Sequence, residues 1–172
     1  MKKHINKIYS KLFKTPSHLT CKMFNSSEVE YRFLTEGEVQ LAKRVFRNLI
    51  DYEKVRIFAI PFFPWQPDDI LMAPNGSLYV NKAIFCEDYS KTSLAMQGVF
   101  IHEMTHILQY QRGVKVFLNG FILQTAYYLS FKKYNPYKYS FYEDKLFVKY
   151  NIEQQGDIAR DIFFDKVPNI II

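Results

Sequence analysis

The segment from Gly98 to Gly113 constrains this chain most, because it carries His102, Glu103 and His106 inside an apolar stretch. On a helix, residues four apart lie on the same face, so both imidazoles can reach one small cation. Glu103 projects from nearly the same edge, where a carboxylate can take a proton from a metal-activated water. Two histidines and a carboxylate on a buried helix need partners. The pattern therefore predicts a hydrolytic zinc site.

The flanks of this segment predict a helix that packs against a core. Within residues 99–108, Glu103 is the only acidic or basic residue besides the histidines. Ser93 is a candidate N-cap, and Gly113 offers a C-terminal stop. One stripe of the predicted helix combines Leu94, Ile101, Thr105 and Leu108.

Two histidines do not close a metal site, so the sequence must supply a third ligand. The other two of the four histidines, His4 and His18, lie in a basic N-terminal stretch. The two cysteines, Cys21 and Cys86, share no ligand spacing. A carboxylate is left, and the candidates after the second histidine are Glu143, Asp144, Glu153, Asp157, Asp161 and Asp165.

Glu153 and Asp157 stand out among these carboxylates, because on a helix they share one face. Gly156 between them is small enough to let this helix pass close to another. We predict Glu153 as the third metal ligand. Asp157 is expected to accept the free N–H of a ligand histidine and so to fix its tautomer. Asp161, one turn further on, either extends this network or faces water.

These residues carry a resemblance to known proteins. A His-Glu-x-x-His helix, followed by a glutamate helix with an aspartate four residues later, is similar to the gluzincin branch of the zinc peptidases, which includes thermolysin. More closely, residues 102–113, 150–157 and 73–76 resemble a group of small bacterial zincin-like proteins. Proteins of that group are associated with Rhs and VgrG components of type VI secretion. The similarity runs from about Val45 to Asp165.

The resemblance implies an α+β, zincin-like fold with a small mixed or antiparallel sheet, an edge strand beside the histidine helix and a C-terminal glutamate helix. It implies Zn2+ on His102, His106 and Glu153, with Glu103 as general base. The implied activity is that of a metallopeptidase on a peptide, protein or peptidoglycan substrate. The implied role is that of an antibacterial effector, with an immunity protein or a VgrG- or Rhs-type carrier as partner.

Composition sets the bounds on size and partners. A chain of 172 residues suits one domain over 1–172 with a sizeable core. Because 48% of the residues are hydrophobic, disorder is not expected. The net charge of +6 suits an anionic partner but is too small to identify one. Lysines and tyrosines interleave over 132–147, but no nucleic-acid fold signature accompanies them, so nucleic acid is not expected as a partner.

Residues 1–30 form a basic extension that we expect to be loosely held. No apolar core of signal-peptide length follows its charges, which predicts synthesis in the bacterial cytoplasm without a Sec signal, and export by type VI secretion. Helical spacing within this extension predicts a short amphipathic helix that docks on the domain or, as the less favoured alternative, on a membrane. Its apolar positions are Ile5, Ile8, Leu12 and Phe13.

The most apolar run of the chain covers residues 114–131. Lys115, Asn119 and Gln124 interrupt it, and it falls short of the roughly twenty residues that a bilayer needs. We therefore expect no transmembrane segment. The run is instead predicted to be a buried helix that covers the histidine helix.

Several shorter signals complete the predicted fold. Thr35 with Glu38 forms a capping box for a first helix that ends near Asn48. Residues 55–60 have the alternation of a strand. Trp65 follows among prolines, where packing over the core is favoured over lining a substrate groove. A last helix over 150–164 is expected to bury Ile152, Ala159, Ile162 and Phe163, and an apolar tail over 170–172 to dock on the body.

The turn Ala73-Pro-Asn-Gly76 predicts a hairpin between residues 70–72 and 77–80. By analogy with zincins, the second strand is a candidate for backbone pairing with a peptide substrate. Its residues are Ser77, Leu78, Tyr79 and Val80. An ordinary core hairpin is the equal alternative.

Residues 132–147 are predicted to form a loop over the mouth of the site, and Tyr142 or Tyr150 is a candidate donor to the developing oxyanion. Two other functions remain open from the sequence. One is a catalytically silent, zinc-stabilised adaptor that keeps the ligands without turnover. The other is a basic surface-binding module.

Overall fold

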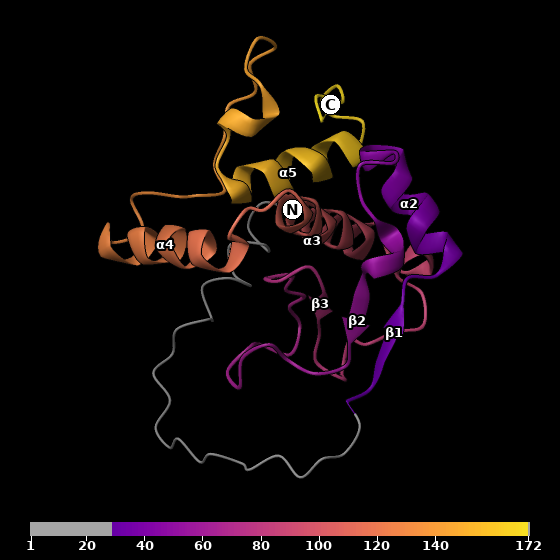
Figure 1. Cartoon of the computed structure of the whole chain (residues 1–172). Helices are drawn as coiled ribbons and strands as arrows, with labels where there is room; N and C mark the ends of the chain where they lie inside the picture. The colour runs from indigo at the N-terminus through magenta and orange to yellow at the C-terminus, as the bar shows by residue number, and fades with distance from the viewer. Residues whose placement is uncertain (1–28, 172) are drawn as a thin grey trace.

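A computed structural model describes residues 29–171 (Figure 1). A small sheet contains three strands in the order of the chain, β1 (Tyr31–Phe33), β2 (Arg56–Phe58) and β3 (Leu78–Tyr79), with β1 antiparallel and β3 parallel to β2. Short 3-10 turns lie at Tyr52–Lys54, Tyr89–Lys91 and Phe147–Lys149. The α-helices are α2 (Glu36–Phe46), α3 (Leu94–Gln111), α4 (Val116–Leu129) and α5 (Ile152–Phe163). The predicted α+β class with a small mixed sheet is what the structure has. The predicted N-terminal helix lies outside the described residues.

The start of α2 is fixed by the predicted capping box. The Thr35 hydroxyl accepts from the Glu38 N–H at 3.1 Å, and the Glu38 carboxylate accepts from the Thr35 N–H at 2.9 Å. Glu38 is fully buried, and its charge is paired with Arg32 at 2.7 Å. It also accepts from the Tyr89 N–H. One carboxylate therefore joins β1, α2 and the turn that precedes α3.

Helix α3 runs through the centre of the molecule, between α5 and the sheet (Figure 1). The Ser93 side chain caps its first turn, as predicted, by accepting from the Met96 N–H. Gly113 ends it with a φ of 82°, a conformation that side chains rarely adopt. Leu94 is exposed, so the predicted apolar stripe is wrong at that position. The fully buried apolar side chains of the helix are Phe100, Ile101, Met104, Ile107 and Leu108.

Helix α4 forms where the apolar run predicts it, but the predicted burial is wrong. The helix lies at the flank of the molecule and projects away from the body (Figure 1). Val116 is its only buried residue. Among the residues described here, no helix is long and apolar enough to cross a membrane.

The predicted hairpin is reduced to a single antiparallel bridge between Met72 and Tyr79. Gly76 makes the turn with a φ of 86°, and a Cβ there would lie 2.5 Å from the Tyr110 ring. At the C-terminal end of the described chain, Ile171 is buried, and the Asn169 side chain donates to the Val45 carbonyl at 2.7 Å. The tail therefore docks on α2, as predicted.

Candidate metal centre

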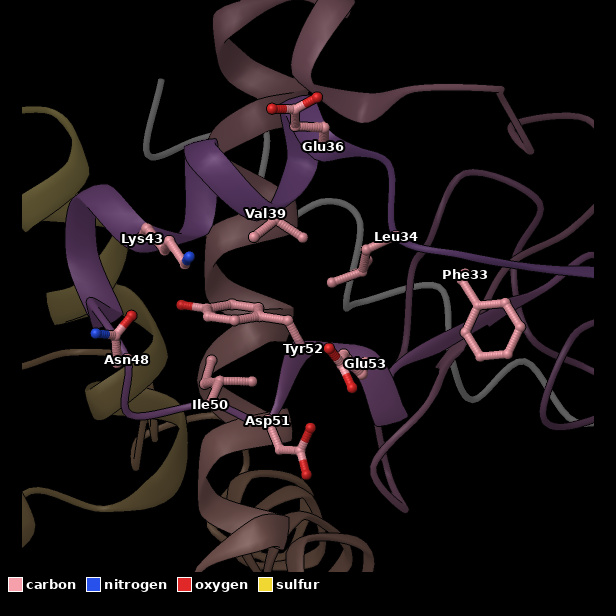
Figure 2. Close-up of a pocket in the computed structure, with 10 residues that line it drawn as sticks. All are labelled: Phe33, Leu34, Glu36, Val39, Lys43, Asn48, Ile50, Asp51, Tyr52 and Glu53. Atoms are coloured by element: carbon pink, nitrogen blue, oxygen red, sulfur yellow. The ribbon is translucent and has the colours of Figure 1, made fainter.

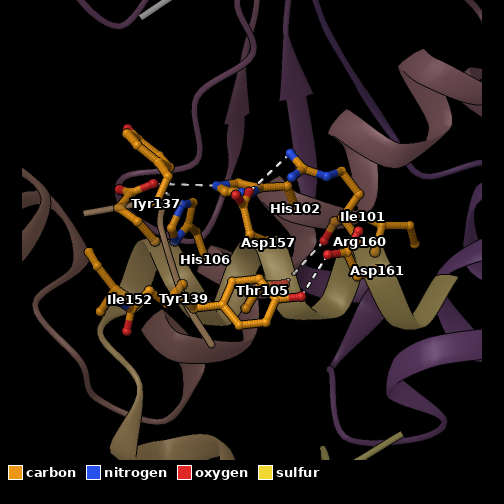
Figure 3. Close-up of polar contacts among 12 residues, drawn as sticks. Ile101, His102, Thr105, His106, Tyr137, Tyr139, Ile152, Asp157, Arg160 and Asp161 are labelled. Atoms are coloured by element: carbon orange, nitrogen blue, oxygen red, sulfur yellow. Dashed lines mark hydrogen bonds and ion pairs between the residues drawn. The ribbon is translucent and has the colours of Figure 1, made fainter. Parts of the chain in front are cut away.

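Helices α3 and α5 bring His102, His106 and Glu153 together. Each offers one ligand atom, and these atoms lie within 4.8 Å of one another. The Glu153 Oε2 atom is 3.4 Å from Nε2 of His102 and 3.8 Å from Nε2 of His106. The two imidazoles lie close together, one turn apart on α3 (Figure 3). These are the three residues that the sequence predicts as metal ligands.

Gly156 allows α5 to approach α3 this closely. A Cβ at this position would lie 2.5 Å from Cε1 of His102 and 2.7 Å from both ring nitrogens. Real Cβ contacts are not this short, so only glycine fits against the imidazole. The register of α5 is fixed at its start by Asn151, whose side chain accepts from the Glu153 and Gln154 N–H groups.

Asp157 orients the first histidine. Its Oδ1 atom lies 3.0 Å from Nδ1 of His102 and 2.9 Å from Nη1 of Arg160 (Figure 3). The contact places the Nδ1 proton between the two residues and leaves Nε2 to face the site. Asp161 does not join this contact. It accepts from the Tyr139 hydroxyl at 2.6 Å and pairs with Lys166.

Gln109 orients the second histidine, a role that the sequence reasoning missed. Its Oε1 atom lies 2.8 Å from Nδ1 of His106, while its Nε2 donates to the Ile152 carbonyl and to Gln155. Because the amide nitrogen donates to two oxygens, its oxygen must face the imidazole and accept the Nδ1 proton. Nε2 of His106 is therefore available to a ligand. The spacing of Gln109, three residues after His106 on one buried helix, was the available signal.

The donor set fits a zinc ion. Nε2 of His102 is buried and has no hydrogen-bond partner among residues 29–171. Its 3.4 Å separation from Glu153 is longer than a good hydrogen bond. A buried polar atom without a partner is costly, and a cation between the three donors would satisfy it. Two imidazoles and a carboxylate with a fourth position open are typical of catalytic zinc.

The histidines and carboxylates of the site shift one another's pKa values. Burial alone would lower the pKa of His102, but Asp157 and Glu153 outweigh it and raise this pKa to about 10. Burial also opposes the charged form of Glu153, yet His106 and His102 hold its pKa below the usual range. Glu153 therefore stays ionised as a ligand must. Burial raises the pKa of Glu103, which makes it a stronger base than an exposed carboxylate.

Glu103 faces a pocket of about 240 Å³ beside the metal centre. The backbone N–H of Ala73 donates to its carboxylate, so the Ala73-Pro-Asn-Gly76 turn positions the predicted base. The pocket wall is mainly apolar. It is lined by Glu103, His106 and Glu153 together with Phe63, Trp65, Leu71, Met72, Ala73, Pro74, Val116, Phe117, Gly120, Phe121, Gln124 and Tyr137.

Trp65 lines this pocket, so the favoured prediction of packing over the core is wrong. Its side chain is 51% exposed and stacks on Phe63 with 5.3 Å between ring centroids. Its position agrees with the alternative prediction, in which Trp65 lines a groove. The next residue, Gln66, is buried instead, and its side chain donates to the Ile70 carbonyl.

The predicted substrate strand over 77–80 is also corrected. Leu78 and Val80 are fully buried, and both backbone groups of Tyr79 are bonded to Met72, at 2.8 and 3.1 Å. Ser77, Leu78, Tyr79 and Val80 thus offer no free edge at this bridge and do not line the pocket. Residues 71–74 lie between them and the site and form that wall.

The tyrosine that lines the pocket is Tyr137, not Tyr142 or Tyr150. Tyr142 is exposed, and the Tyr150 hydroxyl donates to the Ser140 carbonyl. Tyr137 lines the pocket and hydrogen bonds with Glu153. The loop over 132–147 was expected at the mouth of the site, but nothing in the sequence separates this tyrosine from the other twelve of the thirteen.

A larger, shallow depression of about 620 Å³ lies between β1, α2 and the turn at Tyr52–Lys54 (Figure 2). None of the residues of the metal centre lines it. Its charged side chains, Glu36, Lys43, Asp51 and Glu53, are at exposed positions. We assign no chemistry to this surface.

Fold and site together define a small α+β domain whose central helix carries a His-Glu-x-x-His pattern and meets a glutamate helix at a candidate metal centre. No family model matches the chain. The solved structure of the effector domain of Pseudomonas aeruginosa VgrG2b matches it with a TM-score of 0.71 and 43% identity, over 84% of this chain and 79% of that one. The chain therefore belongs to the family of the VgrG2b effector domain.

The chain also matches part of a longer relative in sequence. The chain is 46% identical over 136 residues to the type VI secretion system spike protein VgrG2b of Pseudomonas aeruginosa. The match covers 78% of this chain but only 13% of that protein. The chain thus spans about an eighth of the relative's length and corresponds to its effector domain, not to the whole spike protein.

Proposed function

We propose that this chain is a zinc-dependent metallopeptidase and that it acts as an antibacterial effector in type VI secretion. One observation carries the chemistry: potential ligand atoms of His102, His106 and Glu153 converge, and Glu103 faces the same pocket. Within this cluster, the buried Nε2 atom of His102 has no hydrogen-bond partner among the described residues. The role is supported by membership of the VgrG2b effector-domain family. A VgrG-type carrier and an immunity protein are the partners that this role requires.

The residues of the site have distinct tasks in the proposed reaction. His102, His106 and Glu153 would hold a zinc ion, which when bound would supply Lewis-acid chemistry towards a carbonyl and a water. Glu103 takes the proton of the attacking water and later returns it to the leaving amine. Ala73 holds the Glu103 carboxylate through its backbone N–H. Tyr137, on the same pocket wall, is the residue we assign as donor to the developing oxyanion, a task for which its hydroxyl must turn away from the Glu153 carboxylate.

The pocket indicates what the substrate presents to the site. Its wall contains the aromatic rings of Phe63, Trp65, Phe117 and Phe121, and it lies directly beside the proposed base. Such a wall favours an apolar side chain next to the scissile bond. The substrate we propose is a peptide, a protein or the peptide part of peptidoglycan.

Elemental analysis of the wild type and of Glu153→Ala tests this function, with peptide and peptidoglycan hydrolysis assayed on the same preparations. We expect one zinc per wild-type chain, because three donors and an open position complete a catalytic site. Glu153→Ala should lose or weaken zinc binding and activity, while the exposed carboxylate variant Glu143→Ala should match the wild type. A folded wild type without zinc would refute the proposal. Stoichiometric zinc without hydrolysis would point to the silent adaptor.

Zinc binding should also release about one proton from His102 at pH 7.5. In the metal-free protein, the pKa of about 10 keeps both ring nitrogens of His102 protonated at this pH. The ion must displace the proton on Nε2. Below the pKa of His102, the apparent zinc affinity should therefore fall about tenfold for each unit by which the pH decreases. Titration calorimetry in buffers with different ionisation enthalpies measures the proton count. Binding enthalpies that do not depend on the buffer would contradict this expectation.

A further inference from the structure

Helix α4 ends in the most exposed large apolar side chains of residues 29–171. Leu129 is 76% exposed and Phe131 is 89% exposed. Phe117, Phe121 and Ile122 on the same helix are each about half exposed. No residue of Val116–Leu129 is charged. Large apolar side chains that are exposed along one helix and the turn after it are unfavourable in water, which makes this stretch a candidate binding surface.

The backbone after α4 presents Phe131 outward at a cost. Phe131 has a φ of 54° and Lys132 a φ of 66°, both in the left-handed region that favours glycine. Backbone bonds from their N–H groups to the Tyr128 and Tyr127 carbonyls, at 2.9 and 2.8 Å, hold this turn. The turn places a bulky aromatic ring in solvent next to Lys132 and Lys133. These two bonds are the Schellman arrangement that ends many helices, and the same arrangement ends α5 at Asp165 and Lys166.

Along the chain, the charges that flank α4 have one sign, and the carboxylates of Glu103 and Glu153 lie on its pocket side. Residues 104–142 contain no Asp or Glu. Lys115 precedes α4, and Lys132 and Lys133 follow it. The helix therefore combines an apolar body with cationic ends. Tyrosines at 127, 128 and 134 lie near the second of these ends.

We propose that α4 and the turn after it, residues 116–133, dock on the surface of an anionic lipid bilayer. A bilayer accepts apolar side chains without a complementary shape, lysines reach its phosphate groups, and tyrosines favour the interface. A helix of 14 residues spans about 21 Å, less than the roughly 30 Å hydrocarbon core, so it lies in the interface and does not cross it.

The position of α4 links this surface to the metal centre. Phe117, Gly120 and Phe121 of the docking helix also line the pocket that contains Glu103. Docking of α4 therefore brings the mouth of this pocket to the bilayer surface. The helix needs no metal for this contact, so the proposal stands or falls independently of hydrolysis.

Sedimentation of the full chain with vesicles tests the docking surface, using phosphatidylcholine alone and with added phosphatidylglycerol. We expect binding to the anionic vesicles, and binding at least about tenfold weaker for the double variant Leu129→Gln, Phe131→Asn, because two large side chains no longer enter the interface. Asn tolerates the left-handed conformation, so the turn is retained. Leu146→Gln, which replaces a leucine that is 64% exposed in another segment, is the matched control. It should bind like the wild type.

Charge and metal variants complete the design. Lys132→Gln with Lys133→Gln leaves the apolar side chains in place and should reduce the preference for phosphatidylglycerol, and Glu153→Ala should bind vesicles like the wild type. Failure of the wild type to bind vesicles would overturn the proposal. So would undiminished binding of the Leu129→Gln, Phe131→Asn protein, which would indicate simple basic attraction. A dimer in light scattering that the same variant disperses would assign the surface to a second copy instead.

Discussion

Glu103→Gln should lower kcat for peptide hydrolysis by about 10²- to 10⁴-fold and leave the zinc content unchanged. Glutamine keeps the size of the buried side chain, and its amide oxygen can still accept from the Ala73 N–H. The amide cannot take a proton from water. Because Glu103 lies beside the predicted ligands without being one of them, the ion should remain bound.

Steady-state kinetics and elemental analysis on the same preparation measure both quantities. Glu143→Gln makes the same chemical change at an exposed position and should have wild-type kcat and zinc content. Near wild-type kcat in Glu103→Gln would assign the base to another residue. If Glu103→Gln lost zinc together with activity, Glu103 would instead support the metal site, because a residue that only holds the ligands in place affects both zinc content and kcat.

The sequence predicted the parts of this molecule that local spacing determines. The capping box at Thr35 and Glu38 and the N-cap at Ser93 are confirmed, because each depends on residues within one turn of its helix. The spacing of four residues also placed His102 and His106 on one face of α3. Across helices, Asp157 contacts His102 because α5 carries it one turn after Glu153.

Several other contacts between distant segments were beyond this reasoning. The apolar residues of α4 predicted burial, but burial depends on what packs against a helix, and α4 projects past the body (Figure 1). The strand over 77–80 was one candidate for an edge strand that binds peptide, but β2 pairs with Leu78 and Tyr79 on the side opposite their predicted hairpin partner Met72. Strand pairing is set by tertiary context, which propensity does not encode. Tyr137 reaches the site through an irregular loop whose course no periodicity describes.

Gly156→Ala should weaken zinc binding by about 100-fold or more and destabilise the fold by about 1–3 kcal/mol. The added methyl group would lie 2.5 Å from the His102 ring, so either α5 must withdraw from α3 or the imidazole must rotate. Withdrawal moves Glu153 away from both histidines. Rotation breaks the 3.0 Å contact with Asp157 and turns Nε2 away from the site. Competition with a chelating dye measures the affinity, and thermal unfolding of the metal-free protein measures the stability.

Gly120→Ala is the matched control, because it also adds one methyl group to a helix beside the site. A Cβ at Gly120 has Glu153 Oε1 and the Ile152 side chain at 3.8 and 3.9 Å as its nearest neighbours, which is ordinary van der Waals contact. Helix propensity alone favours alanine over glycine by about 1 kcal/mol at either position. At Gly156, the clash with His102 opposes the gain in helix propensity. At Gly120 there is no such clash, so only the gain in helix propensity remains. A Gly156→Ala protein that unfolded at a higher temperature than the wild type and kept its zinc affinity would show that the close approach of α5 to His102 does not constrain the site.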